Sequence, residues 1–166
     1  MKLYLKQKVF SLKDKFHIYD AQQNELFYAE SEFFTFGKKL HLMNNAGEEV
    51  SFIHQKVMSF LPRYFINVNG EDVAEVVKKF TFIKQKYEIN GLGWIVDGNF
   101  MAHEYTITKD GAPIATISKQ WLTWGDTYEI NIAEDKDTVN VLSVVLVIDA
   151  VMAQSAAAAS AAASSN

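Results

Sequence analysis

The sequence predicts a mainly β domain with one core, in which short strands enclose a single apolar helix near the C-terminus. Three observations predict this fold: alternating runs bounded by turn residues, a 27-residue unit that occurs twice, and one apolar run too long for a strand. A chain of 166 residues has the length of one domain and can bury a sizeable core.

Most of the chain consists of runs rich in aromatic and β-branched residues, separated by turns that contain Asn, Asp or Gly. The first five runs are 3–10, 15–20, 25–36, 39–43 and 49–60. Later runs, such as 114–119, alternate between apolar and polar residues, which indicates strands with one buried and one wet face. Turns at such short spacing are typical of an all-β sandwich or barrel.

The repeat aligns residues 64–90 with residues 105–131 without a gap, and nine of the 27 positions are identical. Its template is Tyr-x-Ile, a Gly turn, an apolar strand with one Ala and one Lys, and then Tyr-Glu-Ile-Asn. The glycine supplies the positive φ that a tight hairpin turn requires. The repeat therefore predicts reused architecture, because an active site is rarely built twice in one small domain.

The run 139–153 has two interpretations. Its β-branched residues favour a strand, but its length favours a helix, and Asp137 or Thr138 offers an N-cap. We predict a helix, which must be buried on all sides because it is apolar nearly all round. At about 22 Å it is shorter than the roughly 30 Å hydrocarbon core, so we expect no transmembrane segment. One domain is expected over 1–153, followed by an Ala/Ser-rich tail over 154–166.

Composition excludes several classes of function. The chain has no cysteine, which excludes disulfide scaffolds, thiolate zinc sites and a cysteine nucleophile. Its net charge of −4 argues against nucleic acid as a partner. No apolar leader follows the N-terminus, so a cytoplasmic location is expected. Residues 1–90 carry 13 basic and 11 acidic residues, and residues 91–166 carry 3 and 9, which favours one basic and one acidic face.

The string Ile-Ser-Lys-Gln-Trp-Leu-Thr-Trp-Gly-Asp-Thr-Tyr-Glu-Ile at 117–130 is the most specific motif of the chain. Together with 98–107 and the closing apolar run, it resembles the LURP-one-related (YxjI-like) family over residues 3–153. That family belongs with the tubby C-terminal domains and the phospholipid scramblases. The resemblance implies a closed antiparallel barrel of about twelve strands around a central hydrophobic C-terminal helix.

The best candidate for a binding surface is basic. It comprises Lys78, Lys79, Lys84, Lys86 and, nearby in the sequence, Arg63. In a strand, Lys84 and Lys86 point to the same face, and such a group attracts an anionic headgroup by about 1 kcal/mol per charge. Tubby domains bind phosphoinositides through surface Lys and Arg, so the resemblance implies a similar ligand. The alternative is that these lysines form a solvated strand face that blunts an edge.

An acidic segment precedes the predicted helix, where the resemblance implies a calcium segment like that of scramblases. Asp135 and Asp137 are its candidate ligands, but Lys136 interrupts them and calcium takes six to eight oxygens. A helix cap in a solvated loop explains the same residues. The four histidines lack the spacing of metal ligands, so no metal site and no cofactor are predicted.

Five further residues are assigned structural roles. Trp121 and Trp124 are expected to fill the core or seal a barrel mouth, and Asp126 to cap a tight turn. Tyr128 belongs to the repeated Tyr-Glu-Ile-Asn unit. Asp149 lies within the apolar run, and a carboxylate there must be paired, hydrogen-bonded or protonated. We expect it at the barrel mouth, within reach of a Tyr, a Lys or a backbone N–H.

Together these features predict a non-enzymatic domain that binds an anionic, phosphoinositide-like lipid at a basic barrel surface. Lys84 and Lys86 would be the main electrostatic contacts. The alternative is a protein-interaction scaffold that uses exposed aromatic residues. A small-ligand barrel is disfavoured because the helix should fill the interior, and a calcium-dependent lipid activity has only the acidic segment in its favour.

Overall fold

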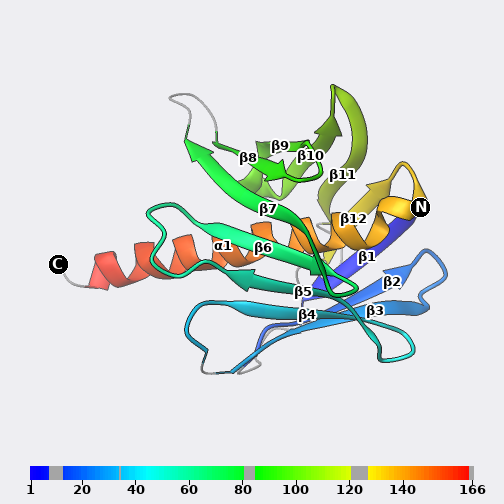
Figure 1. The fold of residues 1–166 in the computed structure, drawn as a ribbon, viewed down its shortest axis with the longest axis horizontal. Helices are drawn as coiled ribbons and strands as arrows, with labels where there is room; N and C mark the ends of the chain where they lie inside the picture. Colours follow the sequence, from blue (N-terminus) through cyan, green and yellow to red (C-terminus); the bar gives the residue numbers. More distant parts are fainter. Residues whose placement is uncertain (8–12, 34, 81–84, 121–126, 165–166) are drawn as a thin grey trace.

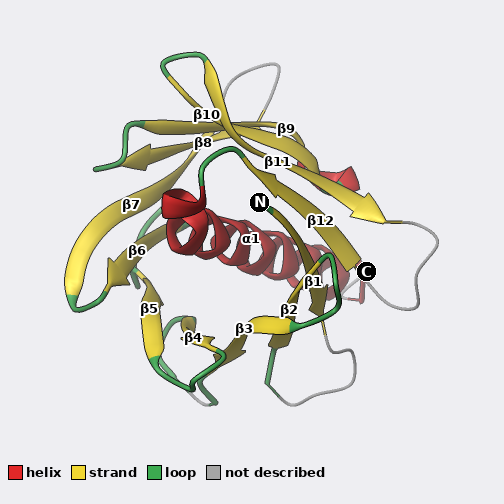
Figure 2. Ribbon diagram, turned by 90° about the vertical axis from the view of Figure 1, so that its right-hand side faces the viewer, coloured by secondary structure: helices red, strands yellow, loops and turns green. Residues whose placement is uncertain are grey.

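The computed structural model describes residues 1–7, 13–33, 35–80, 85–120 and 127–164, and these form a closed barrel of antiparallel strands around one helix. Each strand pairs with the next one in the chain, and β1 closes the barrel against β12 (Figures 1 and 2). The predicted fold of about twelve strands around a central hydrophobic helix is confirmed.

The strands are short and are joined mostly by tight connectors. They are β1 (Lys2–Gln7), β2 (Lys15–Asp20), β3 (Glu25–Ser31), β4 (Lys39–Asn44), β5 (Glu49–Gln55), β6 (Arg63–Val68), β7 (Glu71–Phe80), β8 (Gln85–Asn90), β9 (Trp94–Asn99), β10 (Glu104–Lys109), β11 (Ala112–Gln120) and β12 (Thr127–Ile132). The helical elements are η1 (Phe100–Ala102), η2 (Asp135–Asp137) and α1 (Thr138–Ser164).

Because every connection is antiparallel, the connectors alternate between two ends of the barrel. We call the end where α1 begins the turn end, and its strand-to-strand connectors have two to four residues. We call the opposite end, through which α1 leaves, the loop end, and its connectors have four to seven residues. The two ends are therefore built differently before any side chain is considered.

The repeat corresponds to two three-stranded units, β6–β7–β8 and β10–β11–β12. Their first hairpins turn at Asn69-Gly70 and Asp110-Gly111, and all four residues have positive φ. This is the type I′ geometry that matches the twist of two-residue hairpins. Both hairpins also carry a bulge at the equivalent position, after Ile66 and after Ile107. The prediction that the repeat is architectural is confirmed.

The apolar run is a helix, as predicted, but it is longer than the sequence indicated. α1 has 27 residues and continues through most of the Ala/Ser tail, because alanine extends a helix readily. At about 40 Å it exceeds the thickness of a hydrocarbon core, so the argument from length against a membrane span was wrong. Asp135–Ser164 is long and apolar enough to cross a membrane by length and composition, yet 56% of its most apolar window is buried.

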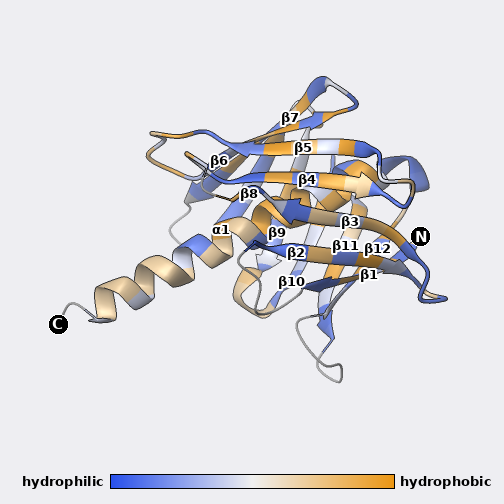
Figure 3. Ribbon diagram, turned by 90° about the horizontal axis from the view of Figure 1, so that it is seen from below, coloured by the Kyte–Doolittle hydropathy of each residue, from blue (hydrophilic) through white to orange (hydrophobic). Residues whose placement is uncertain are grey.

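The barrel buries the first half of α1, and the second half projects from the loop end (Figures 1 and 3). A polar contact fixes the buried half, since the Ser143 hydroxyl donates to the Ser51 hydroxyl of β5 at 2.8 Å. Satisfied polar pairs inside an apolar core favour one packing arrangement over alternatives. Thr138 has helical φ and ψ, and its hydroxyl donates to the carbonyl of Asp135.

Two predicted strands were too long, and each overran at the loop end. The run 25–36 ends as a strand at Ser31, and the run 49–60 ends at Gln55. Of the run 3–10, residues 3–7 belong to β1, and residues 8–10 lie outside the described part of the chain. The error has one cause: apolar residues continue beyond the last paired strand residue, into the connectors.

Candidate functional site

The predicted basic stretch is divided between the two faces of β7. Lys78 follows the inward-facing residues Ala74 and Val76 at alternate positions, and only 6% of it is exposed. Burial lowers the pKa of its ammonium group. The prediction that Lys78 supports a surface group is therefore corrected, because its side chain faces the barrel interior.

Lys79 and Lys86 do lie together on the outer face, where β7 pairs with β8. Both contact the carboxylate of Glu88, at 3.3 Å and 3.2 Å respectively. The hydrogen bond from Lys86, followed by that from Lys79, lowers the pKa of Glu88. This group carries a net charge of +1 rather than +2, so its attraction for an anion is reduced.

Arg63 is the first residue of β6 at the loop end, and its guanidinium contacts the Glu75 carboxylate at 3.0 Å. Lys84, one of the two main predicted contacts, lies outside the described residues. The structure thus brings Lys79 and Lys86 together, as predicted, but Lys79, Lys86 and Arg63 each contact a carboxylate. These three residues therefore do not form a strongly basic surface by themselves.

The predicted calcium segment is η2 with its flanking residues. Asp135 lies 3.5 Å from the amino group of Met1, and Lys136 contacts Glu134 at 2.6 Å. Within the described ranges, no group of three or more His, Asp or Glu side chains is arranged to hold a metal ion. The first carboxylate is thus engaged by a cation of the chain itself.

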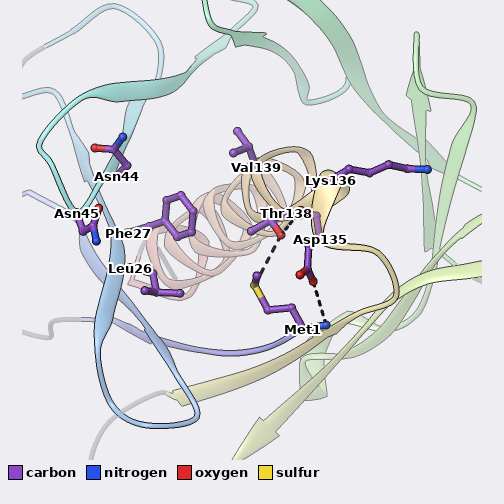
Figure 4. Close-up of a pocket in the computed structure, with 9 residues that line it drawn as sticks. All are labelled: Met1, Leu26, Phe27, Asn44, Asn45, Asp135, Lys136, Thr138 and Val139. Atoms are coloured by element: carbon purple, nitrogen blue, oxygen red, sulfur yellow. Dashed lines mark hydrogen bonds and ion pairs between the residues drawn. The ribbon is translucent and has the colours of Figure 1, made fainter.

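A hollow of about 340 Å³ lies beside this segment at the turn end (Figure 4). Leu26, Phe27 and Val139 give it an apolar wall, and Figure 4 shows the contact between Met1 and Asp135 at its rim. The hydroxyl of Thr138 also lies 3.8 Å from the sulfur of Met1. The hollow is therefore an apolar recess whose rim charges are already paired.

Asp149 lies at the barrel mouth, on the loop end, as predicted. It is half-buried and lines a cavity of about 250 Å³ together with His103 and Tyr128. The rings of His103 and Tyr128 are 4.6 Å apart, which fixes one side of the cavity. Burial, and then the charge of Asp149, raises the pKa of Tyr105 well above its ordinary value.

Trp121, Trp124 and Asp126, to which the sequence assigned structural roles, lie outside the described residues.

The loop end exposes large apolar side chains that the sequence interpretation had placed in strands or left unassigned. In the described part of the chain, the four most exposed are Phe36 (84%), Met58 (98%), Phe60 (101%) and Met101 (81%). They belong to three connectors, 32–38, 56–62 and 100–103, and all three lie at the loop end. Single exposed apolar residues are normal on proteins, but their concentration at one end indicates an interaction surface.

The two ends also differ in charge when described connector residues are counted with the strand-terminal residues that flank them. The turn end has nine carboxylates and three lysines, a net side-chain charge of −6, which the Met1 amino group reduces by one: Asp20, Glu25, Glu48, Glu49, Glu71, Asp110, Glu134, Asp135, Asp137, Lys2, Lys109 and Lys136. By the same count the loop end has six cations and three carboxylates, a net charge of +3: Lys13, Lys15, Lys38, Lys39, Lys56, Arg63, Asp14, Glu32 and Glu104. Two of these cations, Lys15 and Arg63, also pair with the strand carboxylates Glu30 and Glu75, which this count leaves out. This difference between the ends does not follow the division at residue 90, because five of the nine turn-end carboxylates come from residues 1–90.

Lys56 is the cation that sequence reasoning missed. It is exposed, it makes no ion pair with another described residue, and it precedes the exposed residues Val57 and Met58. Local signals could have revealed this connector, because Pro62 follows Phe60 after one residue and proline seldom continues a strand. Gly37 gives the same signal directly after Phe36, since its φ of +84° ends an extended run.

Three comparisons relate the chain to known proteins. A sequence profile described as LURP-one-related matches residues 1–149. The uncharacterized protein YxjI of Bacillus subtilis (strain 168) is 41% identical over 152 residues, which cover 92% of this chain and 94% of that protein. The X-ray structure of the Arabidopsis thaliana protein AT5G01750 has a TM-score of 0.65 and 15% identity, covering 90% of this chain and 91% of that chain. At that identity, the likeness shows a shared fold.

Proposed function

The chain belongs to the LURP-one-related family, and we propose that it is a non-enzymatic domain that binds anionic lipid surfaces through its loop end. One observation carries the proposal: the end that exposes most of the large apolar side chains is also the end with the net positive charge. Membrane-surface binding uses this combination, because cations attract anionic headgroups while apolar side chains enter the interface.

The proposal changes which cations make contact. Lys56 becomes the leading contact because it is exposed, and Lys78 is dropped as a supporting contact because it is buried. Lys79 and Lys86 lie one pair from the loop-end termini of β7 and β8, so they remain in range as supporting contacts. Their shared Glu88 reduces that contribution. The cytosolic leaflet, with its anionic lipids, is the surface that we propose this end faces.

The interior of the barrel supports a binding domain rather than an enzyme. α1 fills it with buried apolar side chains, among them Val144, Leu146 and Ile148. A central ligand cavity of the kind that other barrels use is therefore occupied by protein. This packing favours a role for the outside of the molecule, at the loop end.

The test is co-sedimentation with vesicles of neutral, phosphatidylserine-doped and phosphoinositide-doped lipid at two salt concentrations. Lys56→Glu should weaken binding to anionic vesicles about tenfold or more at low salt, because it changes the loop-end charge by two. Lys109→Glu is the matched control: it is an exposed lysine at the turn end, and its binding should stay within twofold of wild type.

Two outcomes would count against the proposal. Equal losses in Lys56→Glu and Lys109→Glu would mean that only net charge matters and that the loop end has no special role. Binding to no vesicle would remove the lipid function and move the search to a protein partner of the exposed aromatic residues. Binding to phosphatidylserine vesicles and to phosphoinositide vesicles is compared at equal total lipid charge. Stronger binding to the phosphoinositide vesicles would show a preference for that headgroup, and equal binding would show a general attraction to negative charge.

A further inference from the structure

We infer that three connectors of the loop end, 32–38, 56–62 and 100–103, insert apolar side chains into the bilayer, with Phe36, Met58, Phe60 and Met101 as the inserting residues. This inference rests on the proposed lipid binding and adds how the barrel is oriented and how deeply it sits. The axis of the barrel would stand on the membrane with the turn end pointing into solvent.

The positions of the four side chains support insertion at separate points rather than one flat patch. Phe36 lies in connector 32–38. Residues of this connector, among them Lys38, line a hollow together with Gln55 of β5 and Gln154 of α1, so the connector lies next to the helix. Met101 lines the cavity that Met152 of α1 shares. The connectors 32–38 and 100–103 therefore lie beside the part of α1 that leaves the barrel.

The connector 56–62 has the composition of an inserting loop. It reads Lys-Val-Met-Ser-Phe-Leu-Pro and contains one cation and no carboxylate. Met58 takes a positive φ of 60°, so the chain turns at this residue, and its side chain is almost fully exposed. Long lysine side chains beside such a tip can reach the headgroups while the apolar residues lie deeper.

The charge distribution favours an anionic bilayer, rather than another protein, as the partner that contacts the loop end. The net charge of +3 around the apolar tips complements an anionic leaflet, and the net side-chain charge of −6 at the other end opposes the reverse orientation. The projecting part of α1, from Gln154 to Ser164, contains no charged residue, so it adds no charge at the lipid interface. Figure 3 shows that part as mostly apolar in hydropathy.

The absence of cysteine makes the depth of each end directly measurable. Phe60→Cys and Ala46→Cys each create a single labelling site, at the loop end and the turn end respectively, for an environment-sensitive fluorophore. With phosphatidylserine-containing vesicles, the label at 60 should shift to the blue and be quenched by spin-labelled lipid. The label at 46 should keep its emission in water.

A second pair of variants tests the energetics at high salt, where the electrostatic part of binding is screened. Met58→Ser/Phe60→Ser should lower the residual partitioning at least tenfold, whereas Ile95→Ser, an exposed apolar residue on the barrel wall, should stay within twofold. Lys56→Glu should show the opposite pattern, with its loss greatest at low salt.

The outcomes separate insertion from lipid binding as such. Salt-sensitive pelleting with a label at 60 that stays in water would overturn insertion and leave the proposed function intact. Vesicle binding that is unchanged in Met58→Ser/Phe60→Ser would also overturn it, and would assign these side chains to a protein partner. No pelleting of the wild-type chain would overturn both.

Discussion

The turn end and the loop end are made by the same twelve strands, yet they follow opposite rules. At the turn end, connectors of two to four residues hold Asn-Gly, Asp-Gly and Gly residues at positive φ, and charge is acidic. At the loop end, connectors of four to seven residues expose Phe and Met, and charge is basic. The turn end thus uses its residues to fix hairpin geometry, which sets strand register.

The two ends therefore separate residues that stabilise the fold from residues that are available for contact. Large apolar side chains that bury nothing contribute little to folding, so their presence at one end requires another explanation. Longer connectors are the usual carriers of function, because they tolerate residues that strands and tight turns exclude. Substitutions should therefore affect unfolding at the turn end and binding at the loop end.

The largest effect on stability is expected for Gly91→Ala at the turn end. Gly91 has φ +93°, and an added Cβ would lie 2.3 Å from the carbonyl oxygen of Val73. The strained backbone and the clash together should lower the free energy of unfolding by about 2–4 kcal/mol. Gly47→Ala is the control, since Gly47 has φ +80° but open space around its Cβ, and should cost about 1 kcal/mol.

Phe60→Ser completes that comparison from the loop end. The Phe60 side chain is fully exposed, so denaturant unfolding should change by no more than about 0.5 kcal/mol. A loss as large as that of Gly91→Ala would show that Phe60 packs against the domain in solution. In that case the division of roles between the two ends would be incorrect.

Lys78 provides an intermediate test, because it is a cation near the loop end that faces inward. Its folded pKa is below the ordinary 10.5, so the unfolded chain binds more protons between the two values. Stability should therefore rise with pH across that window, up to about 10.5. Lys78→Met should remove this rise relative to wild type, while stability at pH 7 stays within about 1.5 kcal/mol.

The same variant also sharpens the assignment of the binding residues. Vesicle binding by Lys78→Met should equal that of wild type, in contrast to Lys56→Glu. If Lys78→Met instead kept the wild-type pH dependence of stability but lost vesicle binding, Lys78 would belong to the basic binding surface that the sequence predicted.

The fold was predictable because its signals are local and repeated. Alternation, Gly turns and the 27-residue repeat each reflect backbone geometry, and β6–β7–β8 and β10–β11–β12 reproduce that repeat strand for strand. The motif at 117–130 predicted the family correctly. The extent of α1 was left open by the sequence, because the Ala/Ser segment has high helix propensity but no large side chain to bury, and the structure shows that the helix continues to Ser164.

The candidate site was less predictable, and for a physical reason. Hydrophobic patterning does not distinguish an apolar residue that packs in a core from one that faces solvent, so Phe36 and Phe60 were read as strand residues. Ion pairs across neighbouring strands, such as Lys79 with Glu88, depend on a register that a sequence does not give. The sequence of β7 does not show which of its residues point into the barrel, so it predicted Lys78 on the outer face.

The smallest effect is expected at His41, which connects the two ends along the outer face of β4. Its Nε2 lies 2.9 Å from Glu32, in a loop-end connector, and its Nδ1 lies 2.5 Å from Glu49, at the turn-end start of β5. Burial disfavours the charged ring, but the hydrogen bonds to Glu49 and Glu32 outweigh it, and the pKa of His41 is raised above 6.5.

A raised folded pKa stabilises the native state fully below pH 6.5, and this contribution disappears as the pH rises through the folded value. Wild type should therefore exceed His41→Gln in unfolding free energy by about 0.5 kcal/mol at acidic pH, with the difference vanishing at alkaline pH. Urea unfolding of both proteins from pH 5.5 to 9 measures it. A difference that grows with pH instead would mean that His41 is neutral in the native state, and that the two carboxylates are held by Lys39 and solvent rather than by the ring.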